Sequence, residues 1–392
     1  MHTTGLAEPI DSLYEGDCLD EGHGLYEGER LGEALRGARA RTLAIYGHLD
    51  LGALEVPCLP IVNPPLWELA HVAWFQEFWC SRHGPARGAQ ELAGSILARA
   101  DSLFDSTRVA HDSRWTLDYP SMEAIASYMN DTLEATLEAL HGTPEEERYF
   151  FRLALLHEDM HGEALLMTLQ TLGLPAPQAI GDLAPSPAPR ARDVHFAGGE
   201  FVQGSERPGF TFDNERNAHR VTVAPFSMSS SPVSQGEFAR FVDETARTPP
   251  RYWKKERGAW LGRRFDRWMP IDRAAPMVHV SLAEAKAYCD WARRRLPSES
   301  EWEFAARHDG GELAQLIGGV WEWTSTAFAP YPGFTPDPYR EYSEPWFHTH
   351  FVLRGGSFAT TPRIAYARYR NFYLPERGDM FAGFRTCALD AR

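Results

Sequence analysis

Apolar side chains recur at helical spacing in four stretches of the N-terminal half, and polar side chains fill the positions between them. The stretches cover about 32–53, 65–83, 121–141 and 145–172. Apolar residues three and four positions apart share one face of a helix, so each stretch predicts an amphipathic helix. Ser121 and Thr143 precede the last two stretches as helix caps. Four such helices predict an antiparallel bundle.

The pattern changes after this bundle. Residues 175–194 are rich in Pro and Ala and predict a linker. Beyond it Gly, Pro and Trp are frequent, short runs such as HRVTVAPFSMS and FVLRGGSF predict strands, and one clear helix is expected at 281–295. We therefore expect an α+β protein with four parts. These are a poorly ordered arm at 1–30, a helix bundle at 31–174, the linker at 175–194 and a mixed α+β domain at 195–392.

Composition excludes several classes of partner. The net charge of −15 disfavours nucleic acid and anionic membranes, which attract basic surfaces. No apolar run is long enough to span a membrane, and the first residues lack the features of a signal peptide. The 5 cysteines form no CxxC pair, so neither a thiolate zinc site nor a disulfide framework is indicated. We expect a cytoplasmic protein.

Three histidines are the candidate metal ligands. His157 and His161 are four residues apart, which places both imidazoles on one face of a helix. His71 stands among large apolar residues (Trp67, Trp74, Phe75 and Phe78) on an earlier helix, so it too should point inward. Three neutral imidazoles with open coordination positions are typical of a catalytic metal, and they suit both iron and zinc.

The segment around the histidine pair admits a second interpretation. HEDMH matches the zinc-protease pattern HExxH, in which Glu158 would be the general base. The pattern is short, and the third histidine of the extended metzincin motif is absent. Glu163 follows instead and gives HxxxHxE. A zinc hydrolase or transferase therefore remains an alternative to an iron enzyme.

Two sets of motifs resemble known families. WELAHVAWF around His71, followed by HxxxHxE, resembles the DinB-type bundle of the ergothioneine-pathway sulfoxide synthases. RLPSESEWEFAAR, GGVWEWTS, LRGGSF and RNFYLPERGDMFAGFRTC resemble the formylglycine-generating-enzyme fold, which is related to C-type lectins. True formylglycine-generating enzymes carry active-site cysteines after the WEW motif, where Thr324 and Ser325 stand here. The resemblance, over about 30–390, therefore implies a substrate-binding second domain.

The resemblance also implies a chemistry. In these synthases iron(II) binds the imidazole of hercynine and a thiol co-substrate and activates O2, and a tyrosine supplies a proton or an electron. The matching tyrosine is expected to be Tyr331, with Tyr339 and Tyr342 as alternatives. Phe334 would line the imidazole pocket.

The segment Arg370, Asn371, Phe372 and Tyr373 matches the RN-aromatic motif of the family and implies further substrate contacts. Asn371 would bind the carboxylate end of hercynine. Phe372 would face its trimethylammonium group, because aromatic faces attract quaternary cations.

Two departures from the actinobacterial pattern bear on the second substrate. Met160 replaces a Gln that touches the imidazole, and Tyr373 replaces an acidic residue that helps to hold γ-glutamylcysteine. LFDSTRVAHDSRW is similar to the selenoneine synthases, which join hercynine to a selenosugar. We therefore expect selenoneine formation with iron(II) and O2. A sulfoxide synthase that uses γ-glutamylcysteine or cysteine is the alternative, and a non-catalytic lectin-like binding module is a further one.

Overall fold

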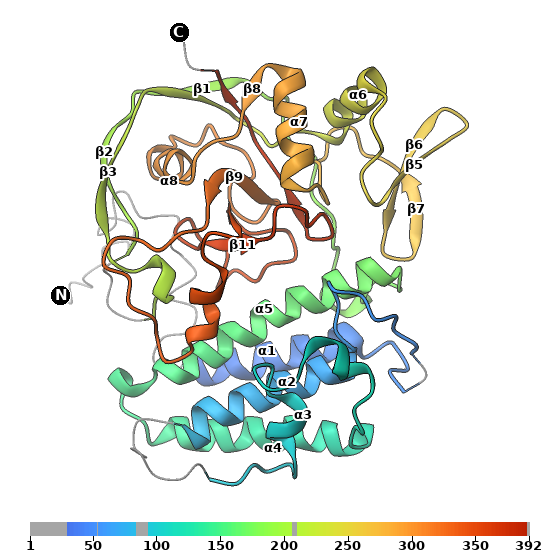
Figure 1. Cartoon of the computed structure of the whole chain (residues 1–392), viewed down its shortest axis with the longest axis vertical. Coiled ribbons are helices and arrows are strands. Elements are labelled where there is room, and N and C mark those ends of the chain that lie inside the picture. The colour runs from blue at the N-terminus through green and yellow to red at the C-terminus, as the bar shows by residue number, and fades with distance from the viewer. Residues whose placement is uncertain (1–29, 53, 84–92, 206–209, 390–392) are drawn as a thin grey trace, which may run out of the picture.

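The computed structural model describes residues 30–52, 54–83, 93–205 and 210–389 and contains two parts, a helix bundle and a sheet-containing domain (Figure 1). The predicted arm at 1–30 lies almost wholly outside the described residues. The main bundle helices are α1 (Arg30–Tyr46), α2 (Pro65–Glu77), α4 (Met122–His141) and α5 (Tyr149–Leu172), and a short α3 (Ala100–Phe104) lies before α4.

Local signals explain several helix ends. Pro65 occupies the first turn of α2, where its missing N–H costs nothing. The Ser121 side chain accepts a hydrogen bond from the Ala124 backbone N–H at 3.2 Å and caps α4 as predicted. Gly173, with φ of 70°, ends α5 in the left-handed conformation that glycine adopts without strain.

Two predicted helix boundaries were wrong. The first helix ends at Tyr46, seven residues before the predicted end at 53. The fourth begins at Tyr149, because Glu145–Glu147 form a separate 3-10 turn. Thr143 does not cap that helix, since its hydroxyl donates to the Ala139 carbonyl of the preceding helix at 2.8 Å.

In the described residues of the second part, the strands form four small sheets. The first contains, in spatial order, β1 (Asp193–Phe196), β4 (Phe226–Ser229), β13 (Cys387–Ala388) and β8 (Arg294–Arg295). The second contains β11 (Asn371–Tyr373), β10 (Phe351–Arg354), β9 (Trp321–Ala327) and β12 (Ala382–Gly383). The others are β2 (Gly199–Gln203) with β3 (His219–Val223), and β5 (Trp253–Glu256), β6 (Ala259–Arg264) and β7 (Arg267–Pro270).

Helices α6 (Gln235–Thr245), α7 (Leu282–Ala292) and α8 (Glu299–His308) pack around these sheets. Only α7 was expected. All three begin with a complete capping box, in which a serine and the glutamate three residues later satisfy each other's backbone N–H groups.

Helix α5 lies between the rest of the bundle and the second domain (Figure 1). Asp159 of α5 accepts two hydrogen bonds from the Arg363 guanidinium, both at 2.7 Å. Glu163 accepts from Trp321, Ser357 and Thr360 of the second domain at 2.6–2.9 Å. The helix that carries two of the candidate ligands is therefore attached to both parts.

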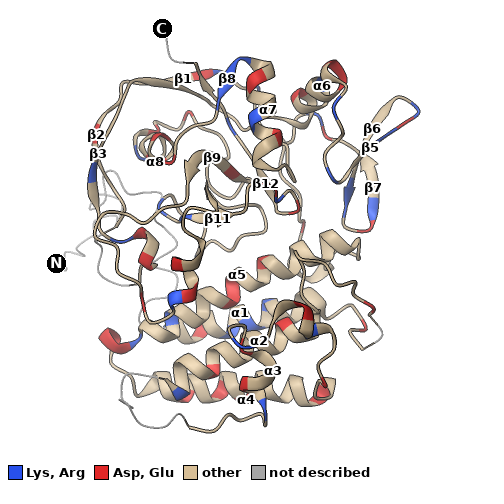
Figure 2. Ribbon diagram, in the orientation of Figure 1, with Lys and Arg blue, Asp and Glu red and all other residues tan. Residues whose placement is uncertain are grey.

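Charge is unevenly distributed over the molecule. The net charge is −15, yet several Lys and Arg residues lie along the sheet formed by β5, β6 and β7 (Figure 2). Acidic side chains occur on helices of both parts (Figure 2). No helix of the described residues is both long enough and apolar enough to cross a membrane.

Candidate metal centre

The structure brings the three predicted histidines together at one point of the bundle. His71 comes from α2, and His157 and His161 come from successive turns of α5. Their ring centroids are 4.4–5.3 Å apart, and one ligand atom from each lies within 4.8 Å of the other two. His71 and His157 are buried, whereas His161 is partly exposed.

Hydrogen bonds orient two of the three rings. His71 donates from Nδ1 to the Phe104 carbonyl at 2.8 Å, and His161 donates from Nδ1 to the Glu68 carboxylate at 2.9 Å. A carbonyl and a carboxylate only accept, so each Nδ1 carries the proton and each Nε2 keeps its lone pair. His157 stacks on Phe75 with 3.5 Å between ring centroids. Its buried Nδ1 has no partner among the described residues.

Burial keeps two of these imidazoles neutral. It lowers the pKa of His71 and of His157 well below the ordinary value, and the neighbouring His161 lowers both further. Neutral imidazoles are metal ligands because the lone pair is available. Three such donors with no carboxylate in the cluster fit a divalent transition metal that keeps open coordination positions.

The glutamates of the two sequence motifs point elsewhere. Glu158, the base of the HExxH interpretation, is buried in an ion pair with Arg39 at 2.8 Å. Adjacent helical residues project about 100° apart, so a glutamate next to His157 faces away from the metal ligands. Glu163 faces the second domain, as described above. The zinc-protease interpretation is therefore not supported by this geometry.

Aromatic residues of the second domain cover the open side of the histidine cluster. Tyr339 lies with its ring centroid 6.3 Å from that of His157 and 4.9 Å from that of Phe75. Among the described residues, its hydroxyl has no hydrogen-bond partner. Tyr342 donates to the Tyr369 hydroxyl at 3.1 Å. Tyr369 in turn donates to the Met160 sulfur at 3.2 Å, so Met160 of α5 contacts the second domain.

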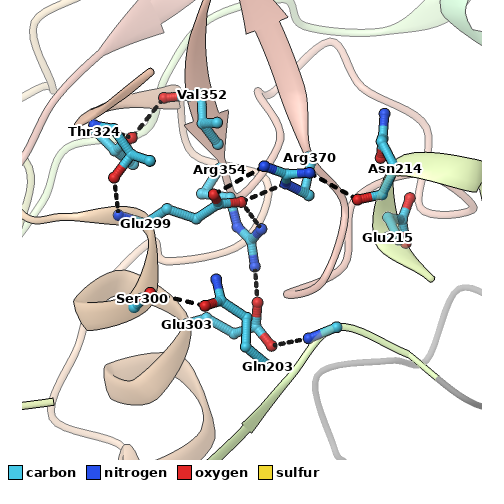
Figure 3. Close-up of polar contacts among 12 residues, drawn as sticks. Gln203, Asn214, Glu215, Glu299, Ser300, Glu303, Thr324, Val352, Arg354 and Arg370 are labelled. Atoms are coloured by element: carbon cyan, nitrogen blue, oxygen red, sulfur yellow. Dashed lines mark hydrogen bonds and ion pairs between the residues drawn. The ribbon is translucent and has the colours of Figure 1, made fainter. Parts of the chain in front are cut away.

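Tyr331 and Arg370 are both buried and both bind Glu299, which belongs to the ion-pair network that Figure 3 shows. Tyr331 donates to Glu299 at 3.2 Å, and the Arg370 guanidinium lies 3.9 Å from its ring centroid. Arg370 binds Glu299 through Nε and Nη2 and donates to the backbone carbonyls of Asn214 and Ala329. All three guanidinium nitrogens of Arg370 therefore have hydrogen-bond partners within the protein.

The other predicted pocket residues all lie in the second domain. Phe372 stacks on Phe328, with 4.1 Å between ring centroids, and its ring centroid lies 6.0 Å from that of Tyr342. It therefore adjoins the tyrosines described above. Asn371 accepts from the backbone N–H of its own neighbour at 2.9 Å. Phe334 makes its ring contact with Phe347 at 5.0 Å and makes none with the three histidines. Tyr373 is partly buried, with the Arg377 guanidinium 5.2 Å from its ring centroid.

Comparison with known proteins agrees with this two-part structure. Residues 34–168 match the DinB superfamily, and residues 180–315 and 308–390 match the Sulfatase-modifying factor enzyme 1-like domain. The chain is 33% identical to the hercynine oxygenase of Mycobacterium tuberculosis, with 91% of this chain and 98% of that protein covered. The chain belongs to the hercynine oxygenase family. The predicted α+β class, with a DinB-like bundle and a formylglycine-generating-enzyme-like domain, is confirmed.

Two further relatives are similar over most of this chain. The hercynine oxygenase of Mycolicibacterium smegmatis is 30% identical, with 91% of this chain and 98% of that protein covered. Ergothioneine biosynthesis protein 1 of Schizosaccharomyces pombe is 29% identical, with 85% of this chain and 52% of that protein covered.

Sequence reasoning missed two residues of the centre in this hercynine oxygenase family member. Glu68 stands three residues before His71 in WELAH, and a glutamate inside an apolar helical stretch is the signal that could have identified it. Tyr369 directly precedes the RN-aromatic segment, and its place against Met160 depends on how the two domains pack. The spacing of residues along the sequence does not indicate how the two domains pack.

The buried ion pairs of Figure 3 lead to a prediction about the free energy of unfolding. Replacing Glu299 with Ala leaves Arg354 and Arg370 buried without their shared carboxylate, which should cost about 3–5 kcal/mol of unfolding free energy. Chemical denaturation measures this change. Glu134→Ala, which breaks the exposed ion pair with Arg36, is the control and should have little effect. A Glu299→Ala protein as stable as the parent would show that the network contributes no net stability.

Proposed function

We propose that this protein is a non-haem iron(II), O2-dependent enzyme that joins the imidazole C2 of hercynine to the selenium of a selenosugar, as a step toward selenoneine. The observation that carries the proposal is the cluster of His71, His157 and His161, placed where the bundle meets the second domain of a hercynine oxygenase family member. Iron(II) held by these three residues would bind the substrates and activate O2, which is the oxidant for the new bond.

The residues of the chain would orient hercynine and shield it. The tyrosine and phenylalanine rings beside the cluster form an apolar wall that excludes water from the imidazole ring. Phe372 presents a ring at the edge of this wall, where a quaternary ammonium group needs an aromatic face. Asn371, on β11, lies next to it and has an amide that can reach a carboxylate.

Tyr339 is the tyrosine that we assign to proton donation. Its ring approaches His157 and Phe75, whereas the Tyr331 hydroxyl is engaged by Glu299. Burial raises the pKa of Tyr339 above its ordinary value, so the phenol keeps its proton at neutral pH and can deliver it from the hydroxyl oxygen.

The pairing of arginines with carboxylates in the second domain supports a neutral donor. In the described residues, four arginines of the second domain are each paired with a carboxylate. The pairs are Arg216–Asp337, Arg363–Asp159, Arg370–Glu299 and Arg377–Asp379. A γ-glutamyl peptide carries an ammonium and two carboxylates, which need charged partners once they leave water. A sugar is neutral and needs hydroxyl groups and an aromatic face, which Tyr339, Tyr342, Tyr369 and Tyr373 supply.

A competition experiment tests the donor. With hercynine saturating and the donors at equal concentration, we expect 1-seleno- or 1-thio-glucose to be consumed at least tenfold faster than γ-glutamylcysteine, a preference of about 1.4 kcal/mol. Mass spectrometry of the products measures the ratio. Preferential consumption of γ-glutamylcysteine or cysteine would assign the protein to the thiol-using sulfoxide synthases instead.

A pair of variants sharpens this test. Tyr373→Asp restores a carboxylate at the position where the charged donor would need one and should shift the preference toward γ-glutamylcysteine. Tyr373→Phe removes only the hydroxyl and should leave the order of preference unchanged. If no donor reacts with hercynine in the iron-loaded parent protein, the proposed function itself is wrong.

A further inference from the structure

Glu68 occupies a position from which it can control a metal ligand on another helix. It lies on α2 one turn before His71, so both side chains leave the same face of that helix. The two side chains nevertheless have different partners. His71 joins the histidine cluster, whereas Glu68 reaches across to α5 and accepts the Nδ1–H of His161 at 2.9 Å.

The carboxylate in this contact is buried, whereas the histidine that it binds is partly exposed. Glu68 is 1% exposed, whereas His161 is the one member of the cluster that is only partly buried. A partly exposed imidazole can rotate or exchange its tautomer unless its second nitrogen is held. The carboxylate accepts only from an N–H, so it fixes the proton on Nδ1 and directs the Nε2 lone pair of His161 toward the cluster.

The three ligands differ in how their second nitrogen is held. A backbone carbonyl, Phe104 O, holds His71, and no described residue holds Nδ1 of His157. Glu68 is therefore the one ionisable group, among the described residues, that hydrogen-bonds to a ring of the cluster. An anionic acceptor makes the imidazole a stronger donor to a cation than a neutral acceptor does.

We propose that Glu68 is a positioning residue that sets the metal affinity of the centre by orienting and polarising His161. This inference rests on the three-histidine metal site of the proposed function, but it is independent of the choice of organic substrates. Glu68 itself stays outside the ligand set, because its carboxylate is directed to the far nitrogen of His161.

The test measures metal affinity in the absence of substrate. Full-length apoprotein is titrated anaerobically with Fe(II), and in parallel with Co(II), against a competing chelator. Glu68→Ala should weaken the affinity by roughly 10–100-fold, the usual effect of removing such a partner. The metal affinity of Glu68→Gln should lie between the affinities of Glu68→Ala and the parent, because the amide oxygen still accepts the Nδ1–H but carries no charge. The Co(II) absorption spectrum reports whether His161 remains a ligand.

Glu77 provides the matched control. It is also a buried glutamate of α2, but it accepts from Ser95, Ile96 and Tyr128 and contacts none of the three histidines. Glu77→Gln should lower the stability of the apoprotein toward denaturant and leave the metal affinity of the folded protein unchanged.

Two results would overturn the inference. One is a Glu68→Ala protein that binds metal as tightly as the parent. The other is a Glu77→Gln protein that loses as much affinity as Glu68→Ala, which would indicate general damage to the bundle. Neither result affects the proposed function, which is tested separately by substitution of His71. A His71→Ala protein that retains its metal would contradict the three-histidine site itself.

Discussion

The His71→Ala variant should bind no iron(II) and form no product. His71 is the only ligand that α2 contributes, so its loss leaves two imidazoles on one helix and no partner across the bundle. Two neutral nitrogens without a third hold iron(II) weakly, because hard and borderline cations need more than two such donors. Metal analysis of protein reconstituted anaerobically with iron(II) gives the direct measurement, and product assays follow on the same samples.

The exposed His141, in the last turn of α4, supplies the control for this experiment. His141→Ala should retain the full iron content and activity of the parent. Near-ultraviolet circular dichroism should retain the contribution of the buried second-domain tryptophans Trp302 and Trp323 in both variants, whereas His71→Ala also changes the surroundings of Trp67 and Trp74, which stack on His71. A His71→Ala protein with the full complement of iron would disprove the ligand assignment.

The second large effect is expected for Tyr339→Phe. If the Tyr339 hydroxyl donates the proton that accompanies bond formation, its loss should lower the rate of coupled product formation by roughly 10²-fold or more. The ring remains and can still pack on Phe75, so hercynine binding should persist. Oxygen uptake measured beside product formation distinguishes a loss of coupling from a loss of binding.

Tyr331→Phe is the companion variant, because the sequence alone favoured Tyr331 for this role. It removes one hydrogen bond to Glu299, whose other partners, Arg354 and Arg370, remain. We expect near-normal coupling from it. Normal yield from Tyr339→Phe together with failure of Tyr331→Phe would return the role to Tyr331.

The bundle could be predicted from the sequence to a large extent because its information is local. Helical spacing located α2, α4 and α5, and the same spacing brought His157 and His161 to one face. Helices α6 and α8 are short, and their apolar positions are interrupted by polar ones. Their capping boxes were the stronger signal.

The choice among the tyrosines could not be predicted in the same way. Tyr331, Tyr339 and Tyr342 lie in the irregular segment between β9 and β10, where no repeating pattern fixes the direction of a side chain. Their directions are set by contacts with distant residues, namely Glu299 for Tyr331 and Phe75 for Tyr339. The contacts of Arg370 could not be predicted for the same reason, because the Glu299 carboxylate that binds it is far away in the sequence.

The attachment of α5 to both parts has a consequence for how the molecule folds and how it can be divided. All three hydrogen bonds to the Glu163 carboxylate come from the second domain, as do both to Asp159. If the linker were cleaved and the bundle released, water would have to replace the second-domain donors to these two carboxylates. Both carboxylates lie close in sequence to His161, on the helix that supplies two of the three ligands. We therefore expect the bundle and the second domain to unfold as one cooperative unit, and we expect the isolated bundle to hold the metal centre less well than the whole chain does.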